Sequence, residues 1–162
     1  MQDRNIFMRV TEDHLMEWKG LQDEILQMVE DYSGESGYDY TFDRATAYST
    51  LWSIVMNDMS DMFVLVDYGQ LKGFAVVYLE SPWMLETQAN IYMFYIKPEC
   101  RKGTVSVRMM KGCCDYFKAR NVKYAFSGST SRVNDRNTQG FERLLERFGF
   151  AKLTTNLMKE IT

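Results

Sequence analysis

The chain has 162 residues, of which 46% are hydrophobic and 25% are charged. This length and composition fit a single globular domain over residues 1–162 and exclude an intrinsically disordered chain. Its 19 basic and 22 acidic side chains give a formal net charge of −3. A protein that coats nucleic acid usually carries a strong basic surplus, so nucleic acid is not an expected partner. No apolar run approaches the roughly 18 residues that a membrane-spanning helix needs, and we expect no membrane partner.

Apolar periodicity and turn residues predict the elements of the first half of the chain. Apolar side chains at three- and four-residue steps mark the buried faces of two helices, and Thr11 is placed to cap the first of them. Tyr68-Gly69-Gln70 lies between two strand-like runs and predicts a hairpin. The expected elements are a strand at 5–10, a helix from 11 to about 31, a break rich in Gly and Ser at 33–40, a helix at about 43–57, and strands at 62–67 and 71–79.

The second half of the chain predicts a strand-helix-strand crossover and a closing helix. The expected elements are a strand at 90–96 stopped by Pro98, a helix at 104–120, a strand at 122–128, a polar loop at 129–136, a helix ended by Gly149, and one or two closing strands in the tail. Strands joined through a helix are parallel, so the sheet should be mixed. The order β-α-α-β-β-β-α-β-α-β predicts an α/β fold with helices on both faces of the sheet.

The cysteines and the histidine exclude several kinds of site. Cys113 and Cys114 are adjacent and poorly placed to bond, and Cys100 lies apart, so we expect free thiols in a reducing compartment, the cytoplasm. His14 is the only histidine, which leaves no Cys/His spacing for zinc. The same fact excludes a Ser-His-Asp or Cys-His triad unless His14 itself is the base. Its expected place in the first turn of a helix favours a structural role.

Three segments carry a resemblance to a known family. They are LVDYGQLKGFAVV at 65–77, YIKPECRKGTVSVRMM at 95–110 and FERLLERFGF at 141–150. Together with the order of elements, they resemble the GNAT superfamily of N-acetyltransferases over residues 62–152. The resemblance implies the acyl-CoA N-acyltransferase fold, with acetyl-CoA as co-substrate and an amine as acceptor. Short, divergent chains of this kind also resemble those encoded by bacteriophages.

The segment after Pro98 is the expected coenzyme site. The N-terminus of a helix exposes unpaired N–H groups and a partial positive charge, which attract a diphosphate. The residues that lead into the helix are Arg101, Lys102, Gly103, Thr104, Val105 and Ser106. The family pattern is Arg/Gln-x-x-Gly-x-Gly/Ala, and anchoring it on Arg101 puts Thr104 and Ser106 where small residues belong. The alternative is a solvated helix start with Thr104 as its N-cap.

The pantetheine arm should lie where the strands at 90–96 and 122–128 separate, because separated strands expose backbone groups that pair with amides. The resemblance implies that the backbone of Tyr95, Ile96 and Lys97 makes these bonds, with Asn134 or Asn137 assisting from the far side. For both asparagines, capping of a turn or helix is the alternative.

The resemblance also directs the search for catalytic groups. Many GNATs use a glutamate base near the strand at 90–96, and Glu86 is the nearest candidate in the connection before it. The family often places a tyrosine acid four residues before the glycine of the closing helix, where this chain has Leu145. Tyr95 is the tyrosine we expect to take its place. Glu86 as an exposed loop glutamate and Tyr95 as a core aromatic are the alternatives.

The loop between the first two helices should form the acceptor side. It offers two carboxylates interleaved with two tyrosines, a set suited to a cationic amine, in Glu35, Tyr38, Asp39 and Tyr40. A solvated loop is the alternative.

Three functions follow from these patterns. The first is an N-acetyltransferase that moves an acetyl group from acetyl-CoA to a small molecule or a protein. The second is a GNAT-like scaffold without catalysis, serving as a structural or binding protein such as a phage virion or host-interaction protein. The third, a nucleic-acid binder, would use Arg101, Lys102, Arg108, Lys111 and the segment 132–136, against the acidic net charge. The sequence leaves open whether the chain forms a homodimer.

Overall fold

The computed structural model describes residues 6–37, 39–81, 85–127 and 135–152, with the backbone alone at 135–137. Its elements are β1 (Ile6–Arg9), α1 (Glu12–Glu17), α2 (Leu21–Glu35), α3 (Arg44–Met56), β2 (Ser60–Asp67), β3 (Gln70–Glu80), β4 (Thr87–Ile96), the 3-10 helix η1 (Pro98–Cys100), α4 (Val105–Ala119), β5 (Val122–Ser127) and α5 (Asp135–Arg147). The expected α/β fold with a mixed sheet is confirmed.

The sheet has the strand order β1-β2-β3-β4-β5. Neighbours from β1 to β4 are antiparallel, whereas β5 runs parallel to β4, as the crossover through α4 predicts. The hairpin between β2 and β3 turns on two residues with positive φ, Tyr68 at 51° and Gly69 at 74°. Both central residues of a type I′ turn need positive φ. Gln70 pairs with Asp67 and therefore belongs to the strand instead of the turn.

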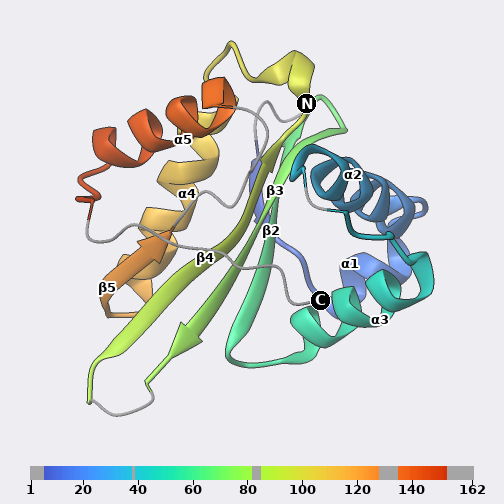
Figure 1. The fold of residues 1–162 in the computed structure, drawn as a ribbon. Coiled ribbons are helices and arrows are strands. Elements are labelled where there is room, and N and C mark those ends of the chain that lie inside the picture. Colours follow the sequence, from blue (N-terminus) through green and yellow to red (C-terminus); the bar gives the residue numbers. More distant parts are fainter. Residues whose placement is uncertain (1–5, 38, 82–84, 128–134, 153–162) are drawn as a thin grey trace.

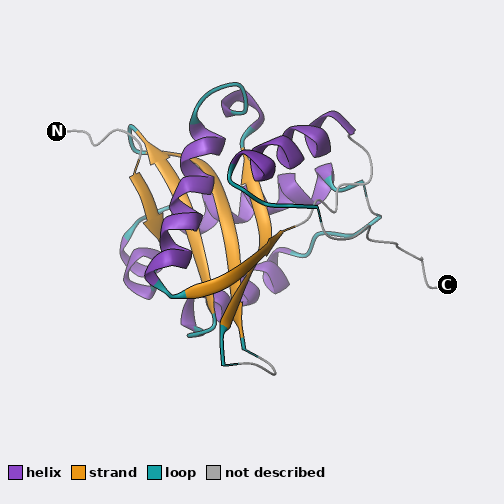
Figure 2. Cartoon of the chain, turned by 90° about the vertical axis from the view of Figure 1, so that its left-hand side faces the viewer, coloured by secondary structure: helices purple, strands orange, loops and turns teal. Residues whose placement is uncertain are grey.

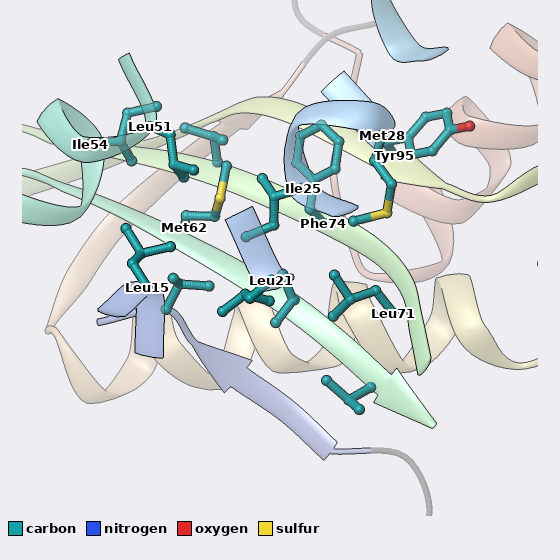
Figure 3. Close-up of a cluster of buried hydrophobic side chains, with 14 residues drawn as sticks. Leu15, Leu21, Ile25, Met28, Leu51, Ile54, Met62, Leu71, Phe74 and Tyr95 are labelled. Atoms are coloured by element: carbon teal, nitrogen blue, oxygen red, sulfur yellow. The ribbon is translucent and has the colours of Figure 1, made fainter. Parts of the chain in front are cut away.

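Helices cover both faces of this sheet. α1, α2 and α3 lie on one face, and α4 and α5 lie on the other (Figure 1; Figure 2 views the molecule from the α4 and α5 side). β2 is buried along almost its whole length, because alternate residues enter two different cores. Met62 and Val64 pack under α1–α3 (Figure 3), while Phe63 packs under α4. The buried face of each helix predicted from periodicity therefore meets the sheet.

The first predicted helix is wrong in its boundaries. The segment from 11 to about 31 forms two helices: α1 ends at its C-cap Trp18, whose backbone is extended (φ −84°, ψ 98°), and α2 begins after Gly20, whose φ of 84° is left-handed. Thr11 caps α1 as predicted, and His14 completes the cap by accepting the Thr11 N–H on Nδ1 at 3.1 Å. α2 continues past the expected break at 33 to Glu35, since its inner face stays anchored in the core.

The second half of the chain follows the predictions more closely. α4 and β5 lie within a residue of their expected bounds, and Gly149 has the expected left-handed φ, 87°. Gly112 of α4 lies against β1: a Cβ there would meet the ring of Phe7 within 2.6 Å. Most of the expected loop at 129–136 and the closing strands of the tail lie outside the described residues. Within the described ranges, no helix combines the length and apolar character needed to cross a bilayer.

Candidate active site

β4 and β5 separate halfway along their length. Their pairing begins at Thr87 and Val122 and ends at Ile91 and Ser127, while β4 runs on to Ile96. On the other edge of β4, Val76 pairs with Met93 and Val77 with Ile91, so one extra residue of β4 forms a bulge at this point. A bulge bends and twists its strand. The bend coincides with the place where β5 leads away from β4 (Figure 1).

A cleft of about 530 Å³ lies at this separation. It is enclosed by α2, the open half of β4, the start of α4, the end of β5, and α5. The residues that line it are Tyr32, Glu35, Ser36, Ile91, Tyr92, Phe94, Tyr95, Ile96, Arg101, Gly103, Ser106, Val107, Ser127, Thr138, Gly140, Phe141, Arg143, Leu144 and Arg147. Segments far apart in the sequence therefore share one cavity.

The N-terminus of α4 presents backbone donors to the cleft. Thr104 occupies the N-cap position with helical backbone angles, φ −88° and ψ 0°, and its side chain makes no capping hydrogen bond. No described backbone carbonyl accepts from the N–H groups of Val105, Ser106 or Val107, whereas Arg108 donates to the carbonyl of Thr104 at 3.0 Å. These amide groups are therefore open to a ligand, and the alternative of a side-chain cap by Thr104 is not what the structure shows.

Arg101 makes protein contacts with its guanidinium group. Its Nε donates to the carbonyl of Ile96 at 2.9 Å, and one Nη donates to both carboxylate oxygens of Glu35, at 2.8 and 2.7 Å. Its guanidinium carbon also lies 5.5 Å from the centre of the Tyr95 ring. Both members of the ion pair line the cleft, but their charges neutralise each other, so a ligand would have to break the pair to bind either charge alone.

Tyr95 is a buried tyrosine, with 3% of its surface exposed. Its ring contacts those of Tyr32 and Phe74, and its hydroxyl points away from the other core side chains in Figure 3. Burial raises the pKa of Tyr95 to about 12, and the negative charges of Glu35 and Asp31 act in the same direction. The hydroxyl therefore keeps its proton at neutral pH and can donate it.

A comparison with known protein families identifies this architecture. The model of the acetyltransferase (GNAT) family matches residues 21–150. The chain belongs to the GNAT acetyltransferase family. A search of curated protein sequences found no match.

Solved GNAT structures share the fold at low sequence identity. A GNAT family acetyltransferase of Staphylococcus aureus is 15% identical, with a TM-score of 0.71 over 98% of this chain and 100% of that one. A ribosomal-protein-alanine N-acetyltransferase of Brucella melitensis is 13% identical, with a TM-score of 0.73 over 98% and 100%. A predicted acetyltransferase of Clostridium acetobutylicum, solved with acetyl-CoA, is 12% identical, with a TM-score of 0.70 over 96% of each chain.

The GNAT cleft does not include Glu86. This glutamate precedes β4, at the end of the strand opposite the cleft, and its Oε1 accepts from Lys123 Nζ at 2.7 Å. The bond from Lys123 lowers the pKa of Glu86, which keeps the carboxylate charged. Leu145 is buried in the core under α4 and α5, as the apolar stripe of the closing helix predicts. Neither of the two positions suggested by the family thus supplies an acid or base to the cleft.

The other predicted residues divide into three groups. Tyr95, Ile96, Arg101, Gly103, Ser106 and Glu35 line the cleft together. The positions that do not line it are Lys97, Lys102, Thr104, Val105, Asp39 and Tyr40. Tyr38 and Asn134 lie outside the described residues, and Asn137 is described by its backbone alone. Glu35 was expected in a loop but ends α2, which explains why it reaches the cleft.

Two kinds of cleft residue were not predicted from the sequence. Arg143 and Arg147 line the cleft from α5, and neither makes an ion pair with a described residue. Their four-residue spacing beside the apolar stripe is a readable signal for one helix face. Ser127, the last residue of β5, has a buried Oγ without a hydrogen-bond partner among the described residues. No sequence pattern distinguishes it from other serines.

Proposed function

We propose that this GNAT protein is an N-acetyltransferase that binds acetyl-CoA in the β4–β5 cleft and transfers the acetyl group to an amine of a small molecule or a protein. The observation that carries the proposal is the meeting of two donor sets in one cavity. The open half of β4 offers backbone groups, and the start of α4 offers N–H groups without described backbone acceptors. An amide-rich arm that ends in a diphosphate needs both.

The residues of the cleft fit each part of such a ligand. The N–H groups at the start of α4 suit the diphosphate, and Gly103 leaves room for close approach. Arg143 and Arg147 add positive charge without a described carboxylate partner. The backbone of Tyr95 and the N–H of Ile96 suit the pantetheine amides, since the Ile96 carbonyl already accepts from Arg101. The buried hydroxyl of Ser127 is a further donor that has no partner among the described residues.

The transfer step forms a C–N bond and breaks the C–S bond of the thioester. The attacking amine loses a proton and the departing thiolate gains one. The Tyr95 hydroxyl is protonated at neutral pH and Tyr95 lines the cleft, so we assign it as the proton donor to the thiolate. Open backbone N–H groups of β4 suit the developing oxyanion. Among the described residues that line the cleft, Glu35 is the one carboxylate, and Arg101 holds it, so we assign no side-chain base.

Isothermal titration with acetyl-CoA and CoA tests the proposal. We expect a 1:1 complex at micromolar ligand, weakened at least about tenfold in the double variant Arg143→Ala/Arg147→Ala, because two phosphate-attracting charges are removed. Asp23→Asn changes a charge remote from the cleft and should leave the titration unchanged. Release of free CoA thiol is then followed with a panel of amines. Absence of heat at high micromolar ligand would overturn the proposal.

A GNAT-like scaffold without catalysis is the second candidate function. The observations that favour it are the apolar Leu145 in the core and the engagement of Arg101 by Glu35. A scaffold that keeps the cleft would bind CoA but give no thiol release with any amine tested. A scaffold that no longer uses the cleft would neither bind CoA in the titration nor release CoA thiol with any amine.

A further inference from the structure

The Arg101–Glu35 ion pair lies in the lining of the cleft and joins the two layers of the fold. Glu35 is the last residue of α2, which covers one face of the sheet. Arg101 follows η1, in the turn that leads to α4 on the other face. The same guanidinium group donates to the carbonyl of Ile96, the last residue of β4. One side chain thus ties together α2, the end of β4 and the turn before α4.

We infer that Arg101 is a positioning residue, held by Glu35, that fixes the open end of β4 and the turn before α4 for coenzyme binding, and that it is not itself a phosphate ligand. This inference rests on the proposed function, because it concerns binding in the same cleft.

The contacts of Arg101 argue against a direct phosphate role. Its Nε donates to a carbonyl and one Nη donates to both oxygens of a carboxylate, so these bonds fix the orientation of the guanidinium group and Glu35 balances its charge. The side chains of Arg101 and Glu35 are 28% and 38% exposed, so water only partly replaces a broken contact. Turning Arg101 toward a phosphate would break its ion pair with Glu35 and leave the negative charge of that carboxylate close to an incoming anion. Arg143 and Arg147 line the same cleft and have no carboxylate partner within the described part of the chain.

The two roles predict opposite effects for Glu35→Gln. If Arg101 binds phosphate, removing the carboxylate frees the guanidinium and removes a negative charge, so CoA should bind more tightly or equally well. If Arg101 is a positioning residue, the same change loosens the turn and the end of β4, and CoA should bind more weakly. We expect a loss of about five- to tenfold, the size of a partly buried charged hydrogen-bond pair.

Comparing CoA with pantetheine distinguishes a positioning role of Arg101 from a phosphate-binding role in a second way. CoA and pantetheine share the amide arm, but pantetheine lacks the diphosphate and the nucleotide. Positioning of β4 serves both ligands, so Arg101→Gln should weaken both by a similar factor. Loss of a direct phosphate contact would weaken CoA alone. Calorimetry measures the Kd for CoA, and NMR titration measures the Kd for pantetheine, which should bind more weakly.

The design uses Glu35→Gln, Arg101→Gln and the double variant, with Asp23→Asn as the matched control. Asp23 lies on the same helix, α2, and pairs with Arg44 at 2.8 Å away from the cleft. We expect the double variant to bind CoA no more weakly than Arg101→Gln alone, since Arg101→Gln already removes the contact with Glu35 as well as the bond to the Ile96 carbonyl. A merely structural defect would lower the binding stoichiometry or the melting temperature, whereas the inference requires a changed Kd at normal stoichiometry.

Each outcome either supports the positioning role of Arg101 or overturns it. Tighter or unchanged CoA binding by Glu35→Gln, or a loss in Arg101→Gln confined to CoA, overturns the positioning role and leaves the proposed function standing. Failure of the wild-type protein to bind CoA refutes the proposed function and the positioning role with it. Parallel losses in both single variants, with the control unchanged, support the inference.

Discussion

Gly73→Ala tests whether the packing between β3 and β4 shapes the cleft. Gly73 pairs with Ile96, and both are buried. A Cβ at position 73 would lie 2.7 Å from Ile96 Cδ1, 3.2 Å from Ile96 Cα and closer still to the carbonyl oxygen of Tyr95. Carbon atoms prefer separations of about 3.5–4.0 Å, so this part of β4 must move by roughly 1 Å. Two of these three contacts are to the backbone of β4, which moves less readily than a side chain does.

We expect Gly73→Ala to lower the free energy of unfolding by about 2–3 kcal/mol, the upper part of the range for overpacked cores. Urea unfolding at 25 °C, followed by tryptophan fluorescence and far-UV circular dichroism, measures the change. Gly34→Ala is the control: nothing lies within 4 Å of its Cβ in α2, and alanine there should stabilise by up to about 1 kcal/mol. Because Tyr95 and Ile96 line the cleft, Gly73→Ala should also weaken CoA binding. A Gly73→Ala variant as stable as the wild type would refute the reasoning.

Three further changes have defined outcomes. Asp61 is buried and accepts from the Tyr116 hydroxyl while pairing with Arg9, so Asp61→Asn should cost about 2 kcal/mol in urea unfolding; an unchanged midpoint would contradict the network. The pKa of Tyr95 is about 12 when folded against an ordinary 10, so its stabilising effect is complete below pH 10 and is lost as the pH rises toward 12. The stability difference between the wild type and Tyr95→Phe should therefore shrink from pH 9 to pH 11, and a constant difference would refute the shift. Burial raises the pKa of Cys113 to about 12, so iodoacetamide at pH 8 should alkylate Cys113 only after unfolding, as peptide mass spectrometry would show.

The sequence predicted the parts of the fold that hydrophobic periodicity controls. The apolar stripe of α4 follows from the need to bury one helix face, and Met109, Met110 and Cys113 are all in the core. The parallel pairing of β4 and β5 follows from the handed crossover between them. The break between α1 and α2 was missed because the apolar spacing continues across it, while the backbone leaves the helical conformation at Trp18 and is left-handed at Gly20.

The cleft was predictable in place but not in detail. Backbone donors at a helix start and a separating strand pair are properties of local sequence and topology, and the structure shows both. The Arg101–Glu35 pair joins residues 66 positions apart, and no local pattern reports such a contact. Glu86 was selected by proximity along the chain, but β4 carries the cleft at its other end. Because β4 is 10 residues long, the position of a residue along the strand decides whether it can reach the cleft.

The source of the thiolate's proton distinguishes a catalyst from a scaffold. Leu145 is packed in the core, so the α5 position favoured by the family offers no hydroxyl, and Tyr95 of β4 is the buried tyrosine that lines the cleft with a raised pKa. We expect Tyr95→Phe to lower the rate of CoA release by about 10²-fold, the usual scale for a general acid, while the Kd for CoA stays within about twofold. Tyr92→Phe, an exposed neighbour on the same strand that also lines the cleft, is the matched control and should retain full activity. An equal loss in both variants would show a general effect on β4, and full activity in Tyr95→Phe would refute Tyr95 as the proton donor, because no phenolic hydroxyl would remain at that position to supply it.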